Sequence, residues 1–163
     1  MNTNAQRLAN PWWFAVAAWL GLIAFSSTSA AGESSERAFS SLSAILLRYF
    51  HVSDRVYWLF HFIADKGVHV TLFAVLAILL WQAIPPGRGK SVVILLAGGL
   101  VGSGSELLQR FFPDRDPAIR DVIINLGGTA FGLMLCWAVS RWQNRHTASE
   151  MTSTAEVCDR FVR

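Results

Sequence analysis

Four apolar runs constrain this chain more than any other feature of its sequence. They cover residues 11–27, 68–84, 92–112 and 122–139. A helix needs roughly 17–25 mostly apolar residues to cross the hydrocarbon core of a bilayer. A helix also satisfies its backbone hydrogen bonds within one segment, which lipid requires. The sequence therefore predicts an all-α fold, a four-helix transmembrane bundle.

The composition agrees with this class of protein. Of the 163 residues, 53% are hydrophobic and 15% are charged, whereas soluble domains have roughly 25% charged residues. Seven Trp and eleven Phe residues fit a membrane protein, because aromatic rings anchor at the bilayer interface. The net charge of +3 is spread along the chain, so no nucleic-acid partner is expected. Cys136 and Cys158 are expected to be free thiols.

The first apolar run has two interpretations. A preceding cation and a following "SSTSAAG" resemble a secretory signal peptide with a small-residue cleavage site. However, Trp12, Trp13 and Trp19 are unusual in the apolar core of a cleaved signal. We therefore favour a retained membrane helix.

Two further segments lie outside the four apolar runs, one between the first and second runs and one after the last. Within residues 28–65, apolar side chains recur at helical spacing, which predicts an interfacial helical segment between the first and second spans. The stretch from Val56 could instead extend the second helix. The transmembrane domain is predicted to cover residues 1–140, followed by a disordered polar tail at residues 141–163. The interfacial periodicity rests on Phe39, Leu42, Ile45, Leu46 and Tyr49.

Cations in the short connections predict the orientation. With four spans, Arg7, Arg88, Lys90, Arg141 and Arg145 all fall on one side of the membrane. Lys and Arg accumulate on the cytoplasmic side of membrane proteins. We expect a multi-pass protein of the cytoplasmic membrane with both termini in the cytoplasm.

Polar residues recur near the opposite ends of three predicted helices. Because consecutive helices alternate in direction, these residues should lie at one membrane level. Spacings of three or four residues also give each helix a single polar side. Ionisable groups within spans tend to face the bundle interior and mark function. The sequence predicts one outward-facing polar pocket lined by Lys66, His69, Glu106, Gln109, Arg115, Asp121 and Asn125.

Glu106 is the deepest charge of this set on its helix. A buried carboxylate is costly unless it is paired, and the expected partners are Lys66 and Arg115. The charges could instead be ordinary solvated helix ends. In that case Asp65 and Asp121 would be N-terminal caps favoured by the helix dipole.

The same residues resemble the pattern of the VanZ-like membrane proteins, a family named after a teicoplanin-resistance protein. The similar stretches are "SSTS", "DKGVHVTLF", "SGSELLQRFFP" and "RDPAIRDVIINLGGTAFG". Two places depart from the family's pattern: Val70 and Thr71 replace an aromatic-rich continuation, and Asp114 replaces a glycine. The resemblance implies a four-helix bundle in the bacterial cytoplasmic membrane and a link to glycopeptide tolerance.

Three functions fit these observations. The first is a non-enzymatic protein whose pocket binds a membrane lipid or lipid-linked envelope precursor. The second is a small intramembrane enzyme that uses Glu106 or Asp121 as acid or base with His69 as a proton shuttle. The third is a purely structural polar network. One His and two carboxylates make a loose metal site, so we expect no metal and no cofactor. The sequence leaves the oligomeric state open.

Overall fold

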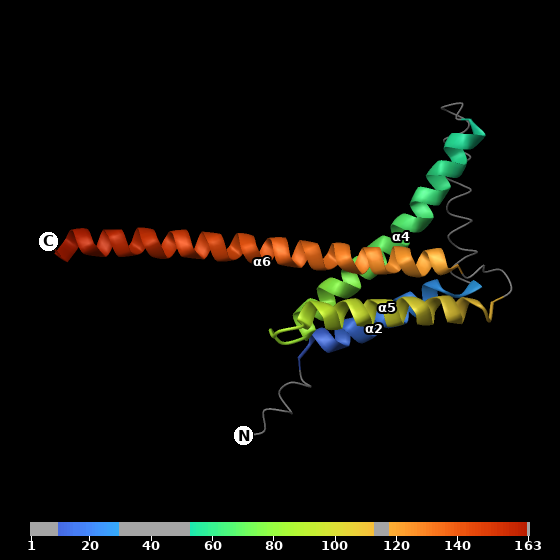
Figure 1. The fold of residues 1–163 in the computed structure, drawn as a ribbon, viewed down its shortest axis with the longest axis horizontal. Helices are drawn as coiled ribbons and strands as arrows, with labels where there is room; N and C mark the ends of the chain where they lie inside the picture. Colours follow the sequence, from blue (N-terminus) through green and yellow to red (C-terminus); the bar gives the residue numbers. More distant parts are fainter. Residues whose placement is uncertain (1–9, 30–52, 113–117, 163) are drawn as a thin grey trace, which may run out of the picture.

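The computed structural model describes residues 10–29, 53–112 and 118–162, and for residues 54, 57 and 148–162 the backbone alone. Within these residues the fold is made of four helices. They are α2 (Trp12–Ser26), α4 (Asp54–Ala83), α5 (Lys90–Gln109) and α6 (Ile119–Val162) (Figure 1). The predicted all-α class and four-helix bundle are confirmed.

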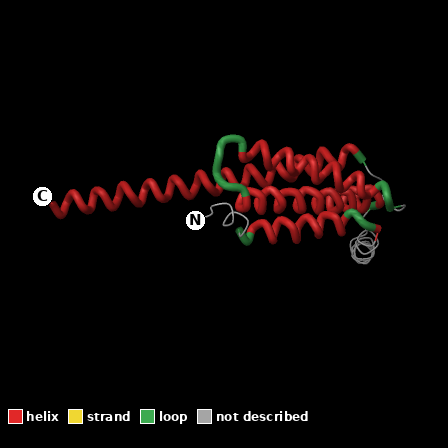
Figure 2. The backbone as a smooth tube through the Cα atoms, turned by 90° about the horizontal axis from the view of Figure 1, so that it is seen from below, coloured by secondary structure: helices red, strands yellow, loops and turns green. Residues whose placement is uncertain are grey.

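Consecutive helices run in alternating directions (Figures 1 and 2). At one end of the bundle, the Asn10 side chain before α2 donates to the Ala83 carbonyl at the end of α4, with 3.3 Å between the atoms. The connection between α4 and α5 lies at this end as well. At the other end, the last turn of α5 lies beside the start of α6. The predicted alternation therefore holds.

The second helix is much longer than the predicted run of residues 68–84. It begins at Asp54, so the alternative in which Val56 extends this helix is confirmed. No proline lies between Pro11 and Pro85, and a residue before proline favours extended backbone, as Ile84 adopts. Lys66 and His69 consequently lie in the middle of α4. The interpretation of Asp65 as an N-terminal cap is wrong. The predicted interfacial helix at residues 39–49 lies outside the described residues.

The fourth helix continues far past the predicted end at residue 139. Its 44 residues reach Val162, which at about 1.5 Å per residue is roughly twice the hydrocarbon thickness. Its C-terminal part projects alone from the bundle (Figure 2). The sequence predicted disorder for residues 141–163, whereas the structure is helical to Val162. No Gly or Pro follows Gly132 to stop the helix, and extending a formed helix is far easier than nucleating one.

Glycines let the helices of the bundle approach closely. A Cβ atom at Gly128 would lie 2.6 Å from the Val70 carbonyl oxygen, and one at Gly132 would collide with the backbone of Ala74. Both contacts join α6 to α4. A Cβ atom at Gly98 would similarly collide with the Thr129 side chain, which joins α5 to α6. Small residues at these positions therefore set the close packing of the polar helix faces.

The bundle has an apolar exterior. Leu96 and Leu100 on α5 and Ile123 on α6 are among many large apolar side chains that are exposed, as expected for lipid-facing positions. Three of the described helices are long and apolar enough to cross a membrane: α5, Trp58–Ala83 of α4 and Ile119–Thr147 of α6. α2 is a shorter apolar helix of 15 residues. It packs on α4, where Trp19 Nε1 donates to the Leu72 carbonyl at 2.8 Å.

Candidate functional site: a polar seam and an adjoining pocket

Lys66 of α4 is the centre of a partly buried ion-pair cluster. Its Nζ lies 2.8 Å from Asp121 Oδ2 at the start of α6 and 2.8 Å from Asp65 Oδ2 on its own helix. Asp121 is only 6% exposed. A buried carboxylate is costly without a partner of opposite charge. The ion pair between Lys66 and Asp121 therefore stabilises the contact between α4 and α6.

A second polar pair lies one helical turn deeper. His69 Nδ1 lies 3.0 Å from Asn125 Oδ1. Because that amide oxygen only accepts, the pair requires a proton on Nδ1. Asn125 is fully buried, and its backbone carbonyl accepts from Thr129 Oγ1 at 3.0 Å. We call the four residues Lys66, His69, Asp121 and Asn125 the α4–α6 seam.

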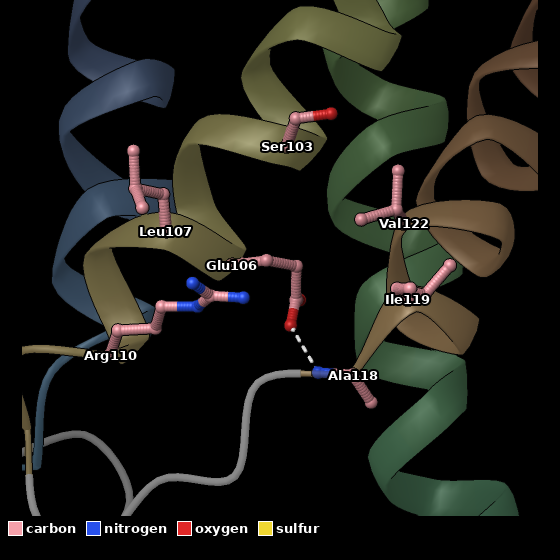
Figure 3. A pocket seen from close by; sticks show the side chains of 7 residues that line it. All are labelled: Ser103, Glu106, Leu107, Arg110, Ala118, Ile119 and Val122. Atoms are coloured by element: carbon pink, nitrogen blue, oxygen red, sulfur yellow. Dashed lines mark hydrogen bonds between the residues drawn. The ribbon is translucent and has the colours of Figure 1, made fainter.

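Glu106 occupies a different place, in the last turn of α5 facing the start of α6. The backbone N–H of Ala118 donates to Glu106 Oε2 at 3.0 Å (Figure 3). The N-terminus of a helix carries free N–H groups and a partial positive charge. The carboxylate, 6% exposed, is therefore held at the start of α6, and among the described residues it forms no ion pair.

A pocket of about 350 Å³ opens beside this carboxylate. Glu106 and Arg110 extend from α5 into the same space, and α6 supplies the facing wall (Figure 3). Leu107 and Ile119 flank it and are themselves exposed on the apolar exterior. We call this the α5–α6 pocket, and it is lined by Ser103, Glu106, Leu107, Arg110, Ala118, Ile119 and Val122.

Three buried polar atoms of the seam and pocket have no hydrogen-bond partner among the described residues. They are Glu106 Oε1, Asp121 Oδ1 and Asn125 Nδ2. Arg120 Nε lies 3.5 Å from Asp121 Oδ1 as an ion pair. An unsatisfied buried polar atom costs about 1–3 kcal/mol. Such atoms are therefore places where a ligand or water would be stabilising.

The structure brings most of the predicted site residues together, but in different pairs. Lys66 was expected to pair with Glu106, and that expectation is wrong: Lys66 contacts Asp65 and Asp121 instead. Gln109 is buried at the end of α5, three residues from Glu106. Arg115, the other expected partner of Glu106, lies outside the described residues.

Sequence reasoning missed several residues of the site. Arg110 was treated as a solvated helix end, although its spacing of four from Glu106 places the two on one side of α5. Thr129, four residues after Asn125, carries the same signal. The apolar lining residues Leu107, Ile119 and Val122 bear no sequence mark that separates them from other lipid-facing residues. Within the described ranges, no group of three His, Cys, Asp or Glu side chains is placed to hold a metal ion.

Comparison with known proteins gives a family match. A family model for VanZ/LLP1 matches residues 12–140, which include α2, α4 and α5 and the first half of α6. No curated protein and no solved structure matches the chain. The match covers most of the chain and contains the whole seam and the whole pocket. The chain belongs to the VanZ/LLP1 family.

Proposed function

We propose that this protein binds the head group of a membrane amphiphile in the α5–α6 pocket. The proposal differs from the sequence-based hypothesis in the groups it uses. Lys66 and His69 were predicted to line the pocket, but they are occupied by Asp121 and Asn125. The α4–α6 seam therefore serves as structural support, and the groups left for a ligand lie in the pocket.

The half-satisfied carboxylate of Glu106 is the observation that carries this proposal. One oxygen accepts from Ala118, and the other is buried without a hydrogen-bond partner in the described part of the chain. The same side chain lines a pocket whose other walls are mostly apolar. Binding sites typically combine an apolar lining with a few placed polar groups. A head group at Glu106 with its chain along the apolar wall fits this combination.

Lipid binding by the purified protein tests the proposal. Val122→Trp would fill the pocket from α6, so native mass spectrometry should show fewer retained lipids than for the wild type. Val139→Trp is the matched control, because it makes the same change at an exposed position of the same helix. Equal lipid retention by the two variants would contradict binding in the pocket.

The orientation remains part of the proposal. Arg88 and Lys90 connect α4 to α5 at the end of the bundle opposite the pocket. The preference of cations for the cytoplasm then places the pocket near the outer surface of the cytoplasmic membrane, with both termini inside. A cysteine introduced at Gly87 should resist a membrane-impermeant maleimide in intact cells. Efficient labelling there would reverse the orientation.

A link to glycopeptide tolerance is suggested by the family name alone. If the pocket acts in the cell envelope, a sensitive host that expresses the protein should tolerate more teicoplanin, and Val122→Trp should abolish the gain. Val139→Trp should retain it. If the gain in tolerance persisted in Val122→Trp, tolerance would not depend on the pocket.

A further inference from the structure

We infer that the α5–α6 pocket takes an amphiphile whose head group places an ammonium group beside a phosphate, the arrangement of phosphoethanolamine lipids. This inference rests on the proposed function and specifies its ligand. It follows from which hydrogen-bond donors and acceptors the pocket still offers.

The floor of the pocket offers acceptors and no spare donor. Ser103 Oγ donates to the Gly99 carbonyl at 2.9 Å, and the Ala118 N–H donates to Glu106 Oε2. These groups use their only hydrogens. Apart from Arg110 at the edge of the pocket, the polar group left for a ligand is Glu106 Oε1, a buried acceptor without a partner among the described residues. A ligand atom that reaches Glu106 must therefore donate a hydrogen bond.

The charge of Glu106 favours an ammonium over a hydroxyl as that donor. The nearby cation Lys66 is already shared by Asp65 and Asp121. In the described residues no ion pair includes Glu106. A buried carboxylate gains most from a partner of opposite charge, and charge-assisted hydrogen bonds are about twice as strong as neutral ones.

The remaining polar group of the pocket suits an anion. Arg110 follows the end of α5, is exposed and lines the same space as Glu106 (Figure 3). Its planar guanidinium matches the oxygens of a phosphate. Because Glu106 and Arg110 are one turn apart, a short head group can reach both. Leu107, Ile119 and Val122 then leave an apolar wall for an acyl chain.

Competition between lipids with identical acyl chains tests this inference. The wild-type protein, reconstituted in nanodiscs, should prefer phosphatidylethanolamine to phosphatidylcholine by about tenfold or more, because the trimethylated head group has no N–H donor. Glu106→Gln should lose this preference, since its amide still accepts from Ala118 but carries no charge. Arg110→Gln should weaken the binding of both lipids alike. Arg141→Gln, which changes an exposed arginine of α6, should weaken the binding of neither.

The possible results separate the inference from the proposed function. Equal binding of the two lipids, with both lost in Val122→Trp, would overturn the ammonium ligand and leave the pocket. A preference for phosphatidylglycerol would overturn it in favour of a hydroxyl donor. Displacement of the lipid by soluble phosphoethanolamine at the same concentration would overturn the need for an acyl chain. If Val122→Trp did not reduce the binding of either lipid, both the inference and the proposed function would fail.

Discussion

Lys66, which is partly buried, and Glu106, which is buried, are both charges near the same end of the bundle, yet their surroundings differ. Lys66 has two carboxylates at 2.8 Å and belongs to the closed α4–α6 seam. Glu106 has one backbone N–H for one oxygen and a pocket beside it. A charge whose partners are supplied by the protein holds helices together. A charge left half-satisfied next to open space is available to a ligand.

The two regions also differ in how their helices approach. Gly128 and Gly132 bring α6 against the backbone of α4, so the seam is closed. Near Glu106, by contrast, a pocket of about 350 Å³ lies between the end of α5 and the start of α6. The four variants below separate a structural region from a binding region, in order of the effect expected on stability.

Lys66→Met should destabilise the protein most, by about 3–5 kcal/mol, because it leaves buried Asp121 with only the exposed Arg120, 3.5 Å away, as a cation. Thermal melting in detergent measures this loss. The control is Lys90→Met, whose ammonium stacks on Trp81 with 4.4 Å to the ring centroid and should contribute about 1 kcal/mol or less. If both variants melted alike, the seam would not hold the bundle.

Asn125→Ala should cost about 2 kcal/mol. It removes the acceptor of His69 and leaves a cavity at a fully buried position. The loss should be smaller than that of Lys66→Met because no charge is stranded and the unpartnered Asn125 Nδ2 disappears as well. Asn144→Ala, at an exposed position of the same helix, should melt as the wild type does. A larger loss for Asn125→Ala than for Lys66→Met would reverse the order within the seam.

Glu106→Gln should change the free energy of unfolding by less than about 1 kcal/mol, since the amide oxygen still accepts from Ala118 and no charge is buried. Lipid selectivity should nevertheless be lost. Melting and lipid competition on the same preparation give both quantities. A fall in melting temperature as large as that of Lys66→Met would assign Glu106 to the structural seam.

Arg110→Gln should have the smallest effect on stability, within about 0.5 kcal/mol, as expected for an exposed side chain outside the seam. Its effect should appear in lipid affinity alone. Wild-type affinity for both lipids would show that Arg110 borders the pocket without contacting its ligand.

Much of the fold could be predicted because helices depend on local sequence. The apolar runs and the turns at prolines predicted four helices in alternating directions, with Lys66, Glu106 and Asp121 near one level. The helix ends were less predictable. The sequence left open whether the stretch from Val56 belongs to the second helix, and the structure shows that it does. The polar composition after residue 140 suggested disorder where an existing helix continues.

The sequence by itself determined that buried polar residues exist, that they occupy one end of the bundle, and that each helix presents them on one side. Only the tertiary structure decided their partners. Helical spacing fixes positions along and around one axis, but not the rotation of that helix against its neighbours. Close contacts at Gly98, Gly128 and Gly132 set that rotation. They turn Asp121 towards Lys66 and leave Glu106 with the first turn of α6, beside a pocket that no single helix encodes.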